Sequence, residues 1–321
     1  MKWNRYGDND ILPMWVADMD FRSPQPVIDA LKARADHGVF GYTEPPGELV
    51  DAAIQTLLEA HSWTVQPDWI LWLPGVVPGL NASCRMAGDP GDEVIVMPPV
   101  YPPFLSAPAH TGRRCVAVPL HRGGDGWSMD LAAIEAAVTP RTRLLMLCSP
   151  HNPVGRVFTR KELAPLARLC RRHDLLVCSD EIHSGLVLDP ERRHLPFALL
   201  DDDAAARSIT LMAPSKTFNL PGLGCAFAVI PDPGVRRRFA KAAAGMVPGV
   251  NLMGYTAALA AYRDGGPWLS ELLTYLRENR DRLMGAVNTL PGLSMSPVEA
   301  TYLAWIDTRS SGIEAPAAFF E

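Results

Sequence analysis

The sequence has few cysteines and none of the spacings that make them structural. Six occur among 321 residues, scattered and without a Cys-x-x-Cys pair, so neither a zinc cluster nor a disulfide framework is expected. The histidines lack the helix-face spacing of metal ligands, and we expect no metal site. A Gly-x-Ser-x-Gly elbow is also missing, which leaves a serine hydrolase without support.

Excess positive charge and long apolar runs are missing as well. The formal net charge is −5, which argues against a surface for nucleic acid or anionic membrane. No run approaches a membrane span, and the N-terminal residues Met1–Arg5 contain no apolar signal-peptide core. We therefore expect a cytoplasmic protein with no membrane or nucleic-acid partner.

What the sequence does contain is a series of short apolar runs separated by amphipathic stretches. Helix-period segments such as Asp130–Ala137 and Lys161–Arg172 lie between several of these runs. Near-continuous apolar strands alternating with helices are typical of an α/β fold with a mostly parallel sheet covered on both faces. The seven predicted strands are Trp69–Leu73, Glu93–Met97, Arg114–Val118, Leu144–Cys148, Leu175–Ser179, Ser208–Met212 and Ala226–Ile230.

Polar or aromatic side chains follow four of these runs, and a glycine-containing turn follows a fifth, at the strand ends where ligands of parallel sheets bind. The turn at Gly75 places free backbone N–H groups before an apparent helix, which suits a phosphate, although it matches neither a Walker loop nor a Gly-x-Gly-x-x-Gly fingerprint. A lysine at a strand end is partly out of water, so its pKa should fall and its neutral amine become available. The other side chains at these strand ends are Tyr101, Asn152, Asp180, His183 and Lys216.

Each residue alone also has a purely structural interpretation. Tyr101 could be a core aromatic, Asn152 a turn residue, Asp180 a helix N-cap, His183 a buried histidine and Lys216 a surface lysine. Together they suit a planar, phosphorylated pyridine cofactor: a phosphate turn, a stacking ring, a carboxylate for the ring nitrogen and an amine for an imine.

Six motifs in chain order resemble the fold-type I, class I/II aminotransferase superfamily of pyridoxal 5′-phosphate (PLP) enzymes, and within it the cystathionine β-lyase/C–S lyase branch. The resemblance covers nearly the whole chain. It implies a three-layer large domain around a mostly parallel seven-stranded sheet and a smaller α/β C-terminal domain. The motifs are Leu12–Phe21, Pro74–Gly79, Pro98–Phe104, Pro150–Pro153, Ser179–Ser184 and Ser215–Leu220.

The resemblance also implies a role for each site residue. Lys216 would be the Schiff-base lysine, Asp180 the partner of the pyridine nitrogen and Tyr101 the stacking ring; these three are the predicted catalytic residues. Asn152 and His183 would hydrogen-bond the ring 3′-oxygen. The phosphate would be held by the backbone of Val76 and Val77 and by Ser215, with Tyr42 reaching it from the neighbouring subunit of a homodimer. Ala17 and Tyr42 would contact the substrate.

Two positions depart from the aminotransferase pattern and favour the lyase branch. Gly224 stands where aspartate aminotransferases have a phosphate-binding arginine, and Ala213 replaces a serine. We expect an N-terminal segment at residues 1–20 that packs with the small domain, a PLP-binding domain at 21–268 and the start of the small domain at 269–321, with Ala300–Asp307 as its first strand. On the family pattern that domain runs about 60–80 residues further and carries the arginine for the substrate carboxylate.

The predicted reaction is PLP-dependent β-elimination of a cysteine S-conjugate such as cystathionine, giving homocysteine or another thiol, pyruvate and ammonia. Lys216 would remove the Cα proton, and Asp180 would keep the ring nitrogen protonated. Three alternatives stay open: a class I/II aminotransferase, a C–S lyase for a specialised-metabolite cysteine conjugate, and a catalytically silent regulatory or scaffold protein with the same fold.

Overall fold

The protein is described by a computed structural model that covers residues 2–4, 7, 10–123 and 126–320. Its strands are β1 (Ile70–Leu73), β2 (Glu93–Val96), β3 (Arg114–Ala117), β4 (His121–Gly123), β5 (Gly126–Ser128), β6 (Thr142–Cys148), β7 (Leu176–Asp180), β8 (Ser208–Met212), β9 (Ala226–Val229), β10 (Ser294–Met295) and β11 (Ile306–Asp307). Its α-helices are α1 (Gln25–His37), α2 (Gly47–His61), α3 (Val76–Met86), α4 (Pro103–His110), α5 (Leu131–Ala136), α6 (Arg160–Arg172), α7 (Asp202–Arg207), α8 (Pro214–Thr217), α9 (Pro233–Ala243), α10 (Leu252–Asp264), α11 (Gly266–Val287) and α12 (Pro316–Phe320).

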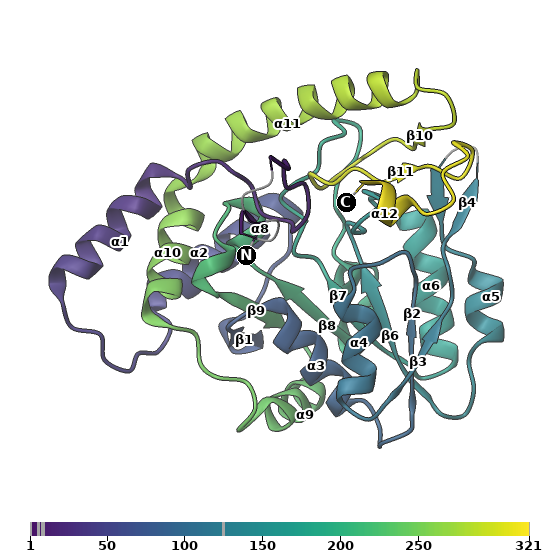
Figure 1. Cartoon of the computed structure of the whole chain (residues 1–321). Coiled ribbons are helices and arrows are strands. Elements are labelled where there is room, and N and C mark those ends of the chain that lie inside the picture. The colour runs from purple at the N-terminus through teal and green to yellow at the C-terminus, as the bar shows by residue number, and fades with distance from the viewer. Residues whose placement is uncertain (1, 5–6, 8–9, 124–125, 321) are drawn as a thin grey trace.

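All seven predicted strands form one sheet in the order β1-β9-β8-β7-β6-β2-β3 (Figure 1). The ladders β2–β3, β2–β6, β6–β7 and β7–β8 are parallel. β9 is antiparallel to both of its neighbours, β1 and β8. Six strands therefore point the same way, and the expectation of a mostly parallel seven-stranded sheet is confirmed.

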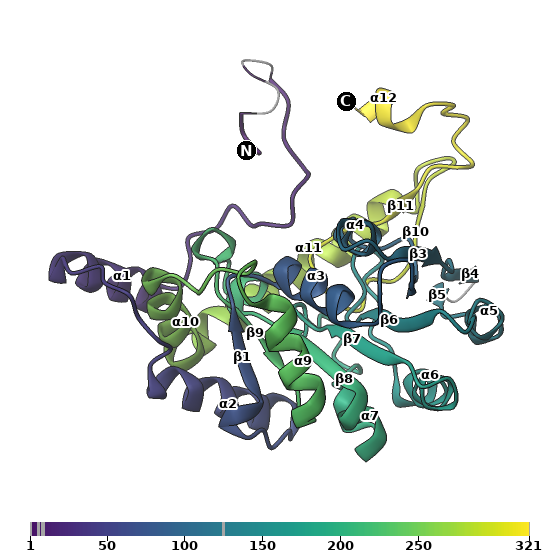
Figure 2. The ribbon, with the colours of Figure 1, turned by 90° about the horizontal axis from the view of Figure 1, so that it is seen from below.

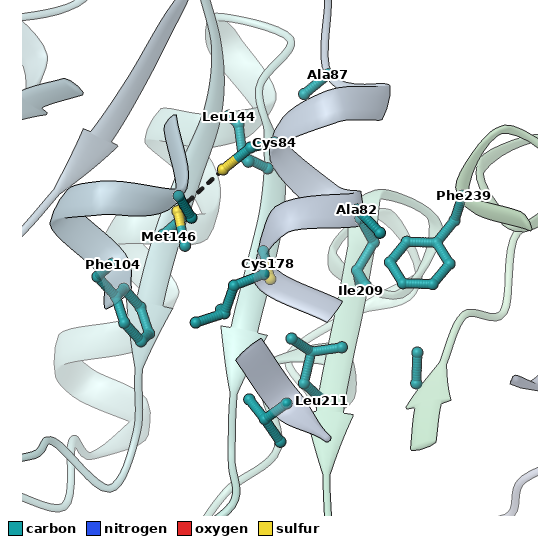
Figure 3. Close-up of a cluster of buried hydrophobic side chains, with 14 of the residues drawn as sticks. Ala82, Cys84, Ala87, Phe104, Leu144, Met146, Cys178, Ile209, Leu211 and Phe239 are labelled. Carbon is teal, nitrogen blue, oxygen red and sulfur yellow. Dashed lines mark hydrogen bonds between the residues drawn. The ribbon is translucent and has the colours of Figure 1, made fainter. Parts of the chain in front are cut away.

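Helices cover both faces of the sheet, as buried two-faced strands require. The helices α3 and α4 lie on one face, and α2, α6 and α7 lie on the other (Figure 2). The core on the α3 face combines sheet residues such as Met146 and Leu211 with Leu80 and Phe104 from the helices, and Cys84 contacts Met146 at 3.5 Å (Figure 3). The predicted three-layer α/β architecture is confirmed.

Local sequence signals set where several helices begin. Thr159 and Glu162 form a capping box at the start of α6, and Asp130 accepts a hydrogen bond from the Ala133 N–H at the start of α5. The first turn of α3 is different, because its N-cap residue is Gly75 and no side chain caps it. The backbone N–H groups of this turn are therefore left for another acceptor.

The predicted strand Ala300–Asp307 is wrong over most of its length. Only Ile306–Asp307 forms a strand, as β11 paired with β10, and Ala300 makes an isolated antiparallel bridge with Val187. Thr301 takes a left-handed φ of 71° and donates its N–H to the Leu186 oxygen, which ends any strand there. The long helix α11 crosses the predicted domain boundary at residue 268 without a break. In the part of the chain that the structure describes, no helix is long and apolar enough to cross a membrane.

Candidate active site

Five parallel strands deliver the predicted site residues to one edge of the sheet. Asn152 follows β6, Asp180 ends β7 and is followed by His183, and Lys216 lies in the short helix α8 after β8. Tyr101 follows β2, and the first turn of α3 follows β1. Because these strands run in the same direction, their carboxyl ends meet at one edge, where ligands bind in such sheets.

Asp180 is a buried carboxyl group with little hydrogen bonding of its own. It is 4% exposed, and its Oδ1 accepts one hydrogen bond from the Ile182 N–H at 3.1 Å. Burial raises the pKa of Asp180 to about 7; that hydrogen bond opposes the rise, the charge of Glu181 adds to it and Lys216 opposes it. The carboxyl of Asp180 can therefore share a proton with a basic ring nitrogen of a bound ligand.

His183 is 1% exposed, and neither of its ring nitrogens has a hydrogen-bond partner among the described residues. Burial, followed by the charge of Lys216, lowers the pKa of His183 to about 3, so the ring is neutral. A neutral imidazole offers one donor and one acceptor. Buried polar groups are normally paired, so these two nitrogens suit a polar ligand.

Lys216 is half-buried, and its Nζ donates a hydrogen bond to the backbone oxygen of Ala17. Burial lowers the pKa of Lys216, while the charges of Asp18 and Asp180 oppose the shift. The direction is the one expected for a lysine at a strand end. It increases the fraction of neutral amine, the form that reacts with carbonyl carbon and accepts protons.

Tyr101 and Asn152 lie side by side, because the Tyr101 N–H donates to the Asn152 backbone oxygen at 3.1 Å. Asn152 is buried, whereas Tyr101 is 37% exposed and presents part of its ring to solvent. Burial and the charge of Asp180 raise the pKa of Tyr101. Tyr101 therefore stays protonated near Asp180, as a ring that could stack on a flat ligand.

The loop after Lys216 packs against the turn before α3. Gly224 has a left-handed φ of 58°, and a Cβ there would lie 3.1 Å from the Pro74 oxygen. A side chain at Gly224 would be both strained and crowded, which gives a physical reason why no arginine stands there. This contact ties the loop that follows Lys216 to Pro74, two residues before the uncapped first turn of α3 at Val76 and Val77.

Tyr42 is set apart from the other predicted residues. It is fully exposed on the loop between α1 and α2. A role for Tyr42 in the cofactor site therefore needs a second chain, as the sequence-based prediction proposes.

Two residues at the site were missed by the sequence reasoning. Tyr302 donates its hydroxyl to the same Ala17 oxygen that Lys216 contacts, at 2.8 Å, and its ring lies 6.1 Å from that of His183. Asn219 binds the backbone of residues 19–21 through its side chain. The motif Ser215–Leu220 contains Asn219, but nothing in the sequence says which distant segment it contacts.

These residues fit a flat, phosphorylated, nitrogen-containing cofactor. The orphaned nitrogens of His183 and the buried carboxyl of Asp180 suit polar ring substituents. The uncapped turn at Val76 and Val77 suits a phosphate. An amine with a lowered pKa suits a covalent bond to a carbonyl carbon.

Comparisons with known proteins find one matching family model and several similar proteins. The family model described as aminotransferase class I and II matches residues 9–320. Cystathionine β-lyase PatB of Bacillus subtilis is 42% identical over 98% of this chain and 82% of its own length. The crystal structure of OvoB is 49% identical, with a TM-score of 0.97 over 99% of this chain and 84% of that one. Cystalysin of Treponema denticola, whose structure contains PLP, is 34% identical, with a TM-score of 0.92 over 97% of this chain and 79% of that one.

Proposed function

Because the chain belongs to the aminotransferase class I and II family, we propose that it is a PLP-dependent carbon–sulfur lyase. Its substrate is a cysteine S-conjugate such as cystathionine. The Cβ–S bond breaks and one water is consumed, giving a thiol (homocysteine from cystathionine), pyruvate and ammonia. The observation that carries the proposal is the set of buried Asp180 and His183 and half-buried Lys216 at the ends of β7 and β8. The names of PatB and of the related C–S lyases support the choice of reaction.

Five sets of residues would hold PLP. Lys216 would bind it covalently, and Asp180 would pair with the ring nitrogen. Asn152 and His183 would hydrogen-bond the ring oxygen, and Tyr101 would stack on the ring. Val76, Val77 and Ser215 would hold the phosphate with backbone N–H groups and a hydroxyl. PLP supplies an electron sink for the negative charge that develops at the substrate Cα.

The side chains of this protein supply the proton transfers and the charge balance. Lys216 Nζ takes the proton from the substrate Cα, for which its lowered pKa is suited. Asp180 would keep the ring nitrogen protonated, because burial disfavours an unpaired carboxylate at this position and a neighbouring cation would stabilise it. Ala17, together with Tyr42 from the neighbouring subunit, would contact the substrate, and the departing sulfur would leave as a thiol.

The substrate test uses cystathionine with PLP and no keto acid. A lyase releases pyruvate and thiol in equal amounts over many turnovers. An aminotransferase, the alternative that the family description favours, stops after one turnover because its cofactor is left in the amino form. A stall at one equivalent of product would refute the lyase assignment. Replacing cystathionine by other cysteine S-conjugates then ranks the leaving groups.

The cofactor test is independent of substrate. Borohydride reduction of the PLP-treated protein should fix the cofactor on Lys216, as read by peptide mass spectrometry. No label on Lys216 would refute the proposed role of this lysine. A biological role that survives Lys216→Ala would instead favour the regulatory or scaffold alternative.

The active form is proposed to be a homodimer in which Tyr42 completes the partner's site. Apolar side chains are exposed on the N-terminal segment and on the loop between α1 and α2: Leu12, Met14, Val39, Phe40 and Tyr42. Several exposed apolar side chains in each segment are typical of surfaces that a partner covers. Sedimentation should give a dimer. Mixing and refolding inactive Lys216→Ala with Tyr42→Ala chains should restore up to about one quarter of the activity, since half of the dimers are hybrids with one intact site. No recovery in a confirmed mixed dimer would refute the shared site.

A further inference from the structure

A short N-terminal stretch, residues 15–23, lies against the lysine loop and is called the N-terminal wall below. Asn219 fixes its middle from both sides: the Met19 N–H donates to Asn219 Oδ1 at 3.0 Å, and Asn219 Nδ2 donates to the Met19 oxygen at 2.8 Å. The same Nδ2 donates to the Phe21 oxygen at 2.9 Å, and the Ser23 hydroxyl donates to the Asn219 oxygen at 2.9 Å. One side chain, three residues after Lys216, thus sets the path of the wall.

The other end of the wall is fixed at one atom, the backbone oxygen of Ala17. This oxygen accepts from Lys216 Nζ and from the Tyr302 hydroxyl. Tyr302 is 285 residues away in sequence from Ala17. The two donors reach the oxygen from the lysine loop and from the segment before β11, so the position of Ala17 depends on both.

Two strained residues stand beside this contact. Val16 has a φ of 69° and Thr301 a φ of 71°, and each immediately precedes a residue of the Ala17–Tyr302 pair. Left-handed φ is a genuine outlier for β-branched residues. Such strain persists where the surroundings over-determine it, and it clusters at functional sites.

The surroundings of Thr301 do over-determine its conformation. Its N–H donates to the Leu186 oxygen at 2.9 Å, and the two residues before it both donate their N–H to the Gly155 oxygen at 2.9 Å. The Glu299 carboxylate accepts from the Val157 N–H at 2.7 Å and pairs with Arg192 at 2.8 Å. The loops that carry Asn152 and His183 therefore aim Tyr302 at Ala17.

We propose that Tyr302 and Asn219 are positioning residues for Lys216: together they hold the Ala17 carbonyl against the lysine amine. This inference rests on the proposed function, because orienting the Lys216 amine matters for catalysis only if that amine removes the proton from the substrate Cα. A carbonyl oxygen that accepts a hydrogen bond from an ammonium group stabilises the charged form of that group. The Ala17 carbonyl, held in place by Tyr302 and Asn219 (called the clamp below), therefore sets how readily Lys216 releases and regains its proton. The titratable groups that face this amine are Asp18, Asp180, His183 and, across Ala17, Tyr302.

Tyr302→Phe removes the hydroxyl and keeps the ring beside His183. With one of its two donors gone, the Ala17 carbonyl turns away as Val16 relaxes, and the amine loses its acceptor. We expect the pKa of Lys216 in the cofactor-free protein to fall by about one unit, the size of one hydrogen bond to a charged group. In the PLP-loaded enzyme, kcat should fall about tenfold with little change in KM, because the amine is misdirected and the substrate contacts remain.

The measurement is the rate at which Lys216 reacts with trinitrobenzenesulfonate across pH, followed by peptide mass spectrometry on the cofactor-free full chain. Tyr275→Phe is the matched control: it keeps the ring that packs 5.4 Å from the ring of Phe21 in the wall and removes only the hydroxyl of an exposed tyrosine on α11, so this variant should leave both the pKa of Lys216 and kcat unchanged. Asn219→Gly is the second variant: it removes the side-chain clamp and tolerates the φ of 56° at that position. It should shift the pKa in the same direction, and it decides the matter if Tyr302→Phe does not fold.

An unchanged pKa of Lys216 and an unchanged kcat in both variants would overturn the proposal. A rise in the pKa would also overturn it, because the hydroxyl would then compete with the lysine for Ala17 rather than place it. The readout in the cofactor-free protein separates this inference from the proposed function. If borohydride fixes no PLP on the wild-type lysine, the function fails while the shift still tests the clamp.

Discussion

Two regions of the molecule meet at Lys216, and they are built in different ways. The strand-end cluster, made of Tyr101, Asn152, Asp180 and His183, stands on parallel strands whose side chains are almost all fully buried. The N-terminal wall is irregular, with neighbours such as Met14 that are 89% exposed. The cluster is positioned by the core, and the wall is positioned by hydrogen bonds to Asn219, Lys216 and Tyr302.

The difference teaches how precision is obtained in each region. Close-packed cores resist displacement, so side chains at strand ends inherit the rigidity of the sheet. An exposed segment opens at low free energy unless specific bonds hold it. The wall can therefore serve as a precise partner of Lys216 only through its few hydrogen bonds. The predictions below separate the two regions.

The largest expected effect is on the residue that both regions share. Lys216→Ala removes the covalent link and the general base together, so we expect pyruvate release from cystathionine to fall by at least about 10⁴-fold. Lys161→Ala, which replaces an exposed lysine on α6, should keep wild-type activity. Substantial lyase activity in Lys216→Ala would show that another group removes the proton.

The stability of the molecule should depend on the core beneath the cluster and hardly on the segment leading to the wall. Phe104 is fully buried in α4 and packs in the core of Figure 3. Phe104→Ala should lower the free energy of unfolding by about 3–5 kcal/mol, because it leaves a cavity. Met14→Ala should change it by less than about 0.5 kcal/mol. Urea unfolding of both variants measures the contrast, and equal effects would contradict it.

The cluster should make the stability of the cofactor-free protein depend on pH. Burial raises the pKa of Asp180 to about 7 from its ordinary 3.8, so its ionisation opposes folding. Wild-type stability should therefore fall relative to Asp180→Asn as the pH rises from 4 towards and through 7, by up to about 4 kcal/mol. Urea unfolding at several pH values tests this. A difference between the two proteins that stays constant with pH would contradict the raised pKa.

The smallest effect is expected at the link between the two regions. Glu299 is buried and binds Val157, Arg156 and Arg192 next to the strained Thr301. Glu299→Gln keeps the shape and removes the charge, so the free energy of unfolding should fall by about 1–3 kcal/mol. Glu271→Gln, on the exposed side of α11, is the control without an expected effect. If Glu299→Gln lowers the free energy of unfolding no more than the control does, Glu299 does not stabilise the contact between the two regions.

The sequence by itself determined the sheet and the cluster. Each of the seven strands of the main sheet was predicted to within two residues of its observed bounds, because apolar runs between turn residues respond to local forces. Asp180, His183 and Lys216 could be placed together because parallel strands bring their carboxyl ends to one edge. Their assignment as cofactor ligands remains a prediction, which their burial and pKa shifts support.

Only the tertiary structure decided the wall and its clamp. The run Ala300–Asp307 has the composition of a strand, yet three backbone hydrogen bonds to distant loops bend it at Thr301 and aim Tyr302 at Ala17. Likewise, the fold alone reveals that Asn219 binds residues some 200 positions away. Local sequence patterns report propensity and periodicity. They do not predict which distant backbone atom a side chain will contact, because that contact forms only when the whole chain packs.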